Sequence, residues 1–484
     1  MTALPMIFQG GMGVAVSDWR LARAVSTEGQ LGVVSGTGID SVLVRRLQDG
    51  DLGGHMRRAL ASFPFADVAS RALETYFRPE GRAPGQPYAR LPLPTVKGST
   101  FARGMTMLAA FSEVFLAKEG HDQPVGLNLL TKVQLPNLAT LYGAMLAGVD
   151  AVLMGAGIPR EEPGALDRLA AQRPASLNVD VAGSAGSGPA PTVAFDPAEF
   201  GGDAIGPLRR PAFLPIISSH ALAKMLLKRA TGAIQGFVVE GPTAGGHNAP
   251  PRGKAALDET GQPVYGERDV PDLAALRAMG LPFWLAGGTG SPEGLRRALD
   301  DGATGIQVGT LFAYSDESGL EADLKRRVIA RALAGQLEVR TDPRASPTGF
   351  PFKAVSLPGT NAEVEPYRRR TRVCDLGYLR EPYRTPAGTI QYRCAAEPVD
   401  AYVAKGGRVE DTVGRKCLCN ALMADVGLPQ VQRDGQTERP LVTSGDALAS
   451  LPRFLRQGAA EYTAGDVVRF LLGRSDARVG ASPA

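Results

Sequence analysis

The amino-acid sequence predicts an α/β fold, a (β/α)8 TIM barrel, with a helical insertion and a cysteine-containing C-terminal extension. Short apolar segments alternate with helical patterns, eight such segments precede residue 345, and glycines follow most of them. In a parallel barrel the strand ends converge on one active face, where glycines let the backbone approach a ligand. We therefore expect residues 1–345 to form the barrel, with insertions at about 40–123 and 173–211, and residues 346–484 to form the extension.

Each of the eight apolar segments has the length of a buried parallel strand. Helical patterns follow most of them, including SDWRLARAVSTEG after the first and SPEGLRRALDDG after the seventh. Parallel strands need such crossover connections, so this alternation predicts a barrel rather than a meander. The predicted strands are residues 5–9, 31–35, 125–129, 151–155, 213–217, 237–240, 282–286 and 305–308.

Two segments are too long to be a single connecting helix. Residues 40–123 contain several helical patterns, and we expect them to cap the ligand pocket. Residues 173–211 include the sequence AGSAGSGPAPT, whose composition predicts a flexible or hairpin insertion before the fifth strand.

The composition restricts the classes of partner. Lysine and arginine number 53 against 49 acidic residues, and a formal charge of +4 is too small to indicate nucleic acid binding. The sequence has no apolar stretch near the roughly 18 residues that a membrane-spanning helix needs, and its N-terminus lacks a signal-peptide pattern. We therefore expect a cytoplasmic protein that binds a small molecule, without nucleic acid or a membrane as a partner.

Glycine-rich segments after the first and the last two strands indicate a phosphate-containing cofactor. Gly10 and Gly11 follow the first strand, Gly287-Gly288 follow the seventh, and Gly309-Thr310 follow the eighth. Barrels commonly bind phosphate after strands seven and eight, through backbone N–H groups and a helix N-terminus. The monophosphate of FMN fits this arrangement. The sequence has neither a P-loop nor a dinucleotide fingerprint after the first strand, which disfavours an ATPase or a Rossmann fold.

The sixth strand is followed by a Gly-Gly-His sequence, within FVVEGPTAGGHN at residues 237–248. Stability alone rarely requires two glycines and an imidazole at a strand exit, and a neutral imidazole can take a proton or hydrogen-bond an anion. A structural histidine is the alternative, but the glycine-rich setting favours a catalytic role for His247. In the long loop that follows, Arg252 and Lys254 are either solvated charges or contacts for an anionic substrate or a nicotinamide phosphate.

Five segments, in this order, resemble the FMN-dependent nitronate monooxygenases and equally the related flavin-dependent enoyl-acyl carrier protein reductases: PMIFQGGMGVAVSDWRLARAVSTEGQLGVVSGTG, VGLNLL, VVEGPTAGGHN, LAGGTG and IQVGTLF. The resemblance extends over about residues 4–350. It implies FMN as the cofactor and His247 as the catalytic residue, although family members usually have glutamate at the position of Thr243. The FMN contacts that it implies are Gly10, Gly11, Met12, Asn128, Glu240, Gly245, Gly288, Gln307, Val308, Gly309 and Thr310.

The resemblance leaves three functions open. The first is a nitronate monooxygenase that oxidises alkyl nitronates with O2. The second is an NAD(P)H-dependent reductase of enoyl thioesters, including enoyl-acyl carrier protein. The third is a flavin- and metal-containing redox-relay module that uses the cysteines of the extension.

The four cysteines, Cys374, Cys394, Cys417 and Cys419, all lie in the extension. Four is the ligand count of a closed thiolate site, although their spacing matches neither a zinc finger nor a ferredoxin. The alternative is that they are small buried apolar residues. We predict an iron–sulfur cluster or a zinc ion at these cysteines, with a structural rather than a catalytic role.

Overall fold

The computed structural model describes residues 4–182, 190–253, 256–455 and 461–474. Eight parallel strands pair in the order β1-β10-β9-β8-β7-β4-β3-β2. A bridge between Phe8 and Leu31 then joins β1 to the start of β2 and closes the sheet. The predicted TIM barrel is confirmed, with every expected strand in place. The strands are β1 (Ile7–Gln9), β2 (Gly32–Ser35), β3 (Val125–Leu130), β4 (Ala151–Gly155), β7 (Ala212–Ile217), β8 (Phe237–Glu240), β9 (Phe283–Ala286) and β10 (Gly305–Val308).

Side chains from the strands fill the interior of the barrel. Phe8 stacks on Trp284 with 4.3 Å between ring centroids, and the Trp284 indole N–H donates to the Pro5 carbonyl at 2.9 Å. Leu153 and Leu214 belong to the same buried cluster. The barrel is therefore a packed core, and a ligand has room only at the ends of its strands.

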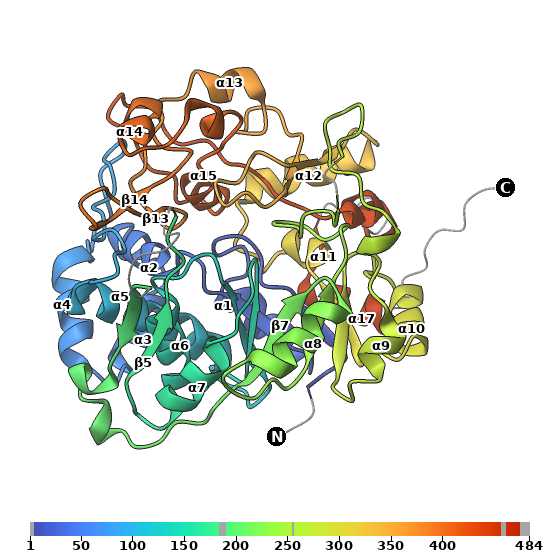
Figure 1. The fold of residues 1–484 in the computed structure, drawn as a ribbon, viewed down its shortest axis with the longest axis horizontal. Helices are drawn as coiled ribbons and strands as arrows, with labels where there is room; N and C mark the ends of the chain where they lie inside the picture. The colour runs from blue at the N-terminus through green and yellow to red at the C-terminus, as the bar shows by residue number, and fades with distance from the viewer. Residues whose placement is uncertain (1–3, 183–189, 254–255, 456–460, 475–484) are drawn as a thin grey trace.

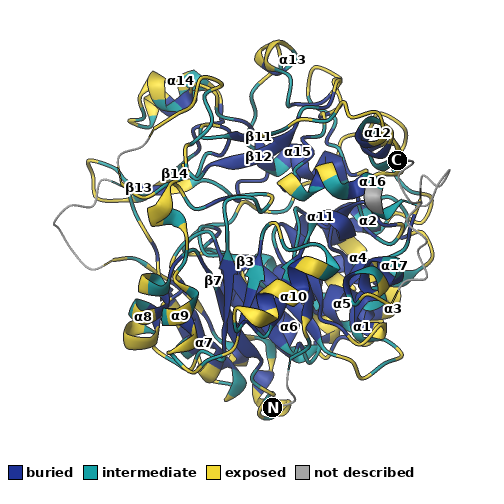
Figure 2. Ribbon diagram, turned by 90° about the vertical axis from the view of Figure 1, so that its right-hand side faces the viewer, coloured by how far each residue is buried: buried dark blue, intermediate teal, exposed yellow. Residues whose placement is uncertain are grey.

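Helices surround the barrel, and the helical insertion packs among them. The insertion comprises α2 (Ile39–Gln48), α3 (His55–Ala61), α4 (Ala66–Tyr76) and α5 (Thr100–Lys118). Helix α5 is buried along nearly its whole length and packs against α6 (Asn137–Leu146), where a Cβ on Gly143 would lie 2.0 Å from the Met107 carbonyl oxygen. Helix α5 is mostly apolar and buried on most of its surface, so it contributes to the core (Figure 2).

The expectation that residues 40–123 cap the pocket is wrong. None of the described residues in this segment lines the cavity at the strand ends. The second insertion does contain the predicted hairpin, in which β5 (Ala175–Asn178) pairs antiparallel with β6 (Thr192–Phe195). Part of its glycine-rich sequence, residues 183–189, lies outside the described residues.

The chain beyond the barrel crosses the face where the strands end and then returns to the barrel's side (Figure 1). Two hairpins, α13 (Val364–Arg368), α14 (Val399–Ala404) and α15 (Leu418–Asp425) form the part that lies over this face. Leu418 and Met423 share a buried cluster with Val14 of the barrel and Val42 of the helical insertion. The last helix, α17 (Ala464–Leu471), packs against α1 (Trp19–Thr27). The hairpins are β11 (Val339–Asp342) with β12 (Phe352–Val355), and β13 (Glu381–Arg384) with β14 (Ile390–Arg393).

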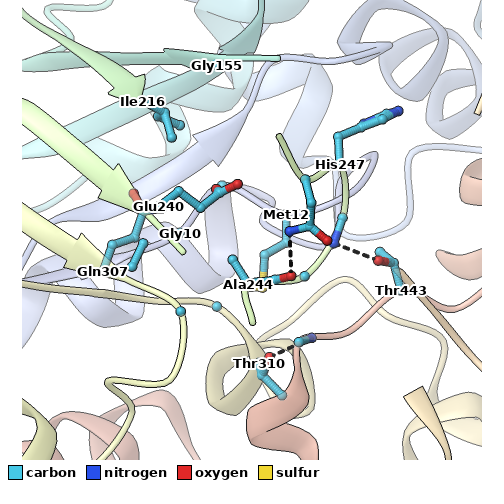
Figure 3. Close-up of a pocket in the computed structure, with 18 of the residues that line it drawn as sticks. Gly10, Met12, Gly155, Ile216, Glu240, Ala244, His247, Gln307, Thr310 and Thr443 are labelled. Carbon is cyan, nitrogen blue, oxygen red and sulfur yellow. Dashed lines mark hydrogen bonds between the residues drawn. The ribbon is translucent and has the colours of Figure 1, made fainter. Parts of the chain in front are cut away.

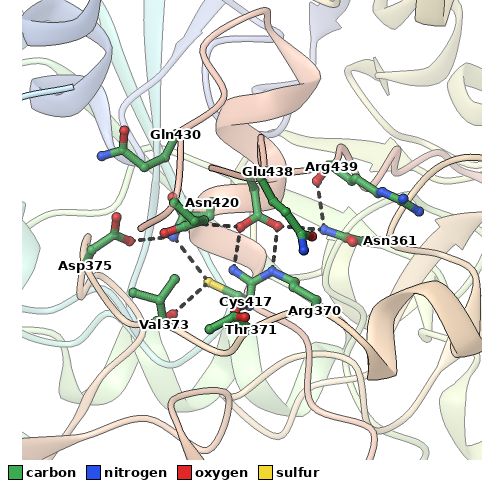
Figure 4. Close-up of polar contacts among 12 residues, drawn as sticks. Asn361, Arg370, Thr371, Val373, Asp375, Cys417, Asn420, Gln430, Glu438 and Arg439 are labelled. Atoms are coloured by element: carbon green, nitrogen blue, oxygen red, sulfur yellow. Dashed lines mark hydrogen bonds and ion pairs between the residues drawn. The ribbon is translucent and has the colours of Figure 1, made fainter. Parts of the chain in front are cut away.

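A buried polar network holds this part of the chain together (Figure 4). Arg370 forms a two-pronged ion pair with Glu438, with its Nε donating to Glu438 Oε1 at 2.7 Å, and Asn361 Nδ2 donates to the same oxygen at 3.0 Å. The Glu438 side chain is 1% exposed, so loss of one partner would leave a buried charge unpaired. The network ties the segments around Asn361 and Arg370 to the segment around Glu438.

Candidate functional site

A cavity of about 360 Å³ lies at the C-terminal ends of the barrel strands. Every residue predicted to contact FMN lines it, and so does His247 (Figure 3). The motifs that were separated by up to 300 positions in the sequence therefore converge on one site. The predicted residues that meet there are Gly10, Gly11, Met12, Asn128, Glu240, Gly245, His247, Gln307, Val308, Gly288, Gly309 and Thr310.

The glycines of the site are required for different physical reasons. A Cβ on Gly11 would lie 2.2 Å from Asn128 Cβ, and a Cβ on Gly245 would lie 2.8 Å from the backbone nitrogen of Gly445. These two glycines permit close packing of the protein against itself. Gly288 instead has a φ of 72°, a left-handed conformation that favours glycine, with the Thr243 hydroxyl 3.3 Å from where its Cβ would be.

The loops after β9 and β10 form the predicted phosphate end of the cavity. Helix α10 (Pro292–Asp300) begins here, and its N-cap residue Ser291 accepts a hydrogen bond from the Gly294 N–H at 3.0 Å. Beside it, the Thr310 hydroxyl oxygen accepts a hydrogen bond from the Gly445 N–H at 3.0 Å. That contact orients the Thr310 hydroxyl, whose own hydrogen stays available for an anion.

Several buried polar atoms around the cavity have no hydrogen-bond partner among the described residues. They include the side-chain oxygens of Asn248 and Gln307, and the hydroxyls of Tyr314 and Ser444 have no partner other than each other. Buried polar atoms are nearly always paired in native proteins, so these atoms indicate that a polar ligand belongs here. Amide, hydroxyl and backbone N–H groups suit the heteroatoms of a flavin ring and a phosphate, and the residues therefore fit FMN.

Glu240 brings a carboxyl group to the cavity from the end of β8. The apolar surroundings raise its pKa to about 8, because they disfavour the charged form. At neutral pH the carboxyl is therefore mainly protonated and can donate a hydrogen bond to a ligand, which a carboxylate cannot do.

We expect Glu240→Gln to remove a pH dependence of FMN binding. Above a pH of about 8 the wild-type carboxyl loses its proton, and if FMN binding requires the neutral form, affinity should fall by up to about tenfold per pH unit. Glutamine has the same shape and stays neutral, so the variant should bind equally well from pH 7 to 9. Titration of apo-protein with FMN across this range measures the difference. Parallel pH profiles for the two proteins would contradict the prediction.

His247 lies in a loop that the extension holds by its backbone. The Gly246 carbonyl accepts from the Lys353 N–H, and the Asn248 N–H donates to the Pro351 carbonyl, both at 2.9 Å. The His247 Nε2 is 2.7 Å from the Ser346 hydroxyl oxygen, and its ring packs edge-on against Phe352. In Figure 3 the imidazole points away from Glu240 and Gln307.

Burial lowers the pKa of His247 to about 4. The imidazole is therefore neutral throughout the usual assay range and has both a donor and an acceptor nitrogen. One of these nitrogens contacts Ser346, which leaves the other for a substrate. Another histidine, His220, is the first residue of α8 (His220–Arg229) and does not line the cavity.

The extension contributes residues to this cavity that the sequence did not predict. The missed lining residues lie far along the chain in segments without a recognisable motif, so no local signal marked them. Arg252, proposed as an anion contact, instead donates to the carbonyls of Arg268 and Ser218 at 2.8 and 2.6 Å, and Lys254 lies outside the described residues. The missed residues are Phe350, Phe352, Leu422, Asp425, Val442, Thr443, Ser444, Gly445 and Ala447.

The four cysteines converge on a second, much smaller cavity. Cys394 and Cys417 are buried and pack with Cys374, and Cys419 completes the lining. Burial raises the pKa of the Cys417 thiol to about 11, so it stays protonated. Among the described residues there is no group of three or more His, Cys, Asp or Glu side chains placed to hold a metal ion. The predicted iron–sulfur cluster or zinc ion is therefore unsupported.

In the described part of the chain, no helix combines the length and the apolar character needed to cross a membrane.

Two solved structures share the overall arrangement at low similarity. A nitroalkane oxidase from Streptomyces ansochromogenes is 16% identical, with a TM-score of 0.46, covering 97% of this chain and 95% of that one. The enoyl reductase domain of MlnA from Bacillus amyloliquefaciens is 12% identical, with a TM-score of 0.47, covering 97% and 93%.

Sequence comparison identifies more specific relatives. A nitronate monooxygenase from Pseudomonas aeruginosa is 34% identical over 145 residues, 29% of this chain and 34% of the relative. A (3aS,4S,5R,7aS)-5-hydroxy-7a-methyl-1-oxo-octahydro-1H-indene-4-carboxyl-CoA dehydrogenase from Mycobacterium tuberculosis is 30% identical over 120 residues, 25% of this chain and 30% of the relative. These matches span about a third of the length of each relative. Residues 208–345, which include the Gly-Gly-His loop and both phosphate loops, match the family model for nitronate monooxygenase. Through this region the chain is similar to the nitronate monooxygenases.

Proposed function

We propose that this protein is an FMN-dependent oxidoreductase that oxidises alkyl nitronates with O2. The observation that carries the proposal is the single cavity in which His247, Glu240 and the glycine-rich strand ends meet. The 34% identical relative from Pseudomonas aeruginosa, named a nitronate monooxygenase, supports the choice of substrate.

Each part of the cavity has a chemical task in this proposal. The loops at Gly288 and Gly309-Thr310 would hold the phosphate, and the orphaned Gln307 amide oxygen would contact the ring. Bound FMN would supply a two-electron acceptor. His247 would hydrogen-bond the nitronate through the ring nitrogen that Ser346 does not contact, and the surrounding apolar side chains would exclude water.

A second candidate is a reductase of enoyl thioesters that uses NAD(P)H. Two curated relatives, 30% identical over 120 and 118 residues, are named dehydrogenases of a carboxyl-CoA compound, which is a thioester. A neutral imidazole could equally donate a hydrogen bond to a thioester carbonyl. The redox-relay alternative has no comparable support, because the described residues offer no metal-holding group.

Anaerobic reduction of the bound flavin distinguishes the two candidates. We expect propyl-2-nitronate to bleach the absorbance of the oxidised flavin in the purified holoenzyme within the time of one turnover. NADPH alone should leave this absorbance unchanged. Bleaching by NADPH and not by the nitronate would reject nitronate oxidation in favour of thioester reduction. If neither compound bleached the flavin, both candidates would be wrong.

A further inference from the structure

One wall of the cavity comes from residues 442–447, which lie more than 100 positions beyond the last barrel strand. The Thr443 hydroxyl accepts a hydrogen bond from the Gly246 N–H at 3.0 Å and donates to the Lys353 carbonyl at 2.6 Å. The Asp446 N–H donates to the Thr243 carbonyl at 3.0 Å. This segment is therefore tied at both ends to the loop that follows β8.

Within this wall, Gly445 packs closely against the loop that follows β8. A Cβ on Gly445 would lie 2.8 Å from the Thr243 carbonyl oxygen and 3.1 Å from the Gly245 nitrogen. This packing places the Gly445 N–H on the Thr310 hydroxyl, at the predicted phosphate end of the cavity (Figure 3). A contact this close would be lost if a side chain as small as a methyl group were added to either glycine.

Two hydroxyl groups next to this contact are buried and face each other. Ser444 is 4% exposed and Tyr314 is 1% exposed, both line the cavity, and among the described residues neither hydroxyl has a hydrogen-bond partner outside this pair. Tyr314 follows Thr310 by four positions on one short helical turn, which places their side chains on the same face. Burial holds the pKa of the Tyr314 phenol well above its usual range, so the phenol keeps its hydrogen.

We infer that the hydroxyls of Ser444, Tyr314 and Thr310 form a subsite for the phosphate oxygens of FMN, to which the C-terminal extension contributes Ser444. The inference rests on the proposed cofactor. No lysine or arginine is among the described residues that line the cavity. Hydroxyl groups can instead stabilise the charged phosphate oxygens by donating hydrogen bonds to them. The extension is therefore part of the cofactor site.

The subsite predicts a selective effect on FMN over riboflavin, which has the same ring and ribityl chain but no phosphate. Ser444→Ala and Tyr314→Phe each remove one hydroxyl and add no bulk. Each should weaken FMN binding to the apo-protein by about 10- to 100-fold, the effect of losing one hydrogen bond to a charged group. Each should change riboflavin binding less than about twofold. Quenching of flavin fluorescence on titration measures all of these dissociation constants.

Ser450→Ala provides the matched control, since Ser450 lies three positions beyond this segment and does not line the cavity. It should bind both flavins as the wild type does. Equal weakening of FMN and riboflavin in the Ser444 and Tyr314 variants would overturn the phosphate assignment, as would unchanged FMN binding. A wild-type protein that binds neither flavin would instead reject the proposed cofactor.

Discussion

Gly288→Asp is expected to give a folded protein that does not retain FMN. The new carboxylate would stand at the phosphate end of the cavity, in a loop that exposes backbone rather than side chains to the ligand. Two unit charges about 4 Å apart repel by about 4 kcal/mol at an effective dielectric of about 20, which corresponds to a loss of affinity of about 10³-fold. Absorbance of the purified protein and FMN titration of the apo-protein measure the effect.

Gly288→Asn separates charge from conformation. Gly288 has a φ of 72°, and asparagine and aspartate tolerate this left-handed conformation about equally well. The asparagine variant should therefore have a similar thermal stability and lose much less FMN affinity. Riboflavin binding should suffer less than FMN binding in the aspartate variant, because riboflavin lacks the phosphate. If the two variants lost FMN affinity equally, repulsion of a phosphate would not be the cause.

The barrel could be predicted because its signals are local. Each strand is a short apolar run with a glycine-rich exit, and a parallel barrel brings such exits together whatever the intervening sequence. That topology alone made neighbours of Gly10, Glu240 and Thr310. The position of α5 could not be predicted from helical periodicity, because periodicity does not indicate which neighbours a helix packs against. Its mostly apolar composition does indicate a core position.

The wall supplied by the extension could not be predicted in this way. Its contacts join residues far apart in the chain, as between Gly445 and Thr310, and depend on backbone groups rather than on a motif. The sequence around Ser444 is LVTSGDA, which is an ordinary loop composition. The four cysteines indicated a metal site because cysteine is rare in this sequence. Rarity alone does not distinguish a metal site from apolar packing.

The setting of His247 shows how the extension affects chemistry. Family members usually have glutamate at position 243, and loss of that residue raises the question of what orients the imidazole. Thr243 lies against Gly287 and Gly288, and the ring nitrogen contacts Ser346 instead. Ser346 is fully buried, and its hydroxyl is also 2.8 Å from that of Thr348. A hydroxyl pair from the extension therefore fixes the ring.

His247→Ala is expected to keep FMN and to lower turnover of the best substrate by about 10²–10⁴-fold, the usual contribution of a positioned proton donor or acceptor. FMN retention should be normal because the predicted phosphate contacts lie on other loops. Since the pKa of His247 is lowered to about 4, the wild-type rate should show no inflection near pH 6.5, where an ordinary histidine titrates. Steady-state kinetics from pH 5 to 9 measure both effects.

Two further variants identify the source of any loss. His220→Ala removes a histidine that does not line the cavity, and its turnover should match that of the wild type. Ser346→Ala keeps the imidazole but removes its hydrogen-bond partner, so we expect a smaller loss, of about tenfold, with the flavin still bound. Ser346→Thr keeps a hydroxyl and should recover part of that loss. If Ser346 had only a structural role, the larger threonine would give no higher turnover than alanine. If His247→Ala turned over at the wild-type rate, the imidazole would have no part in the reaction and its apolar contact with Phe352 would explain its position.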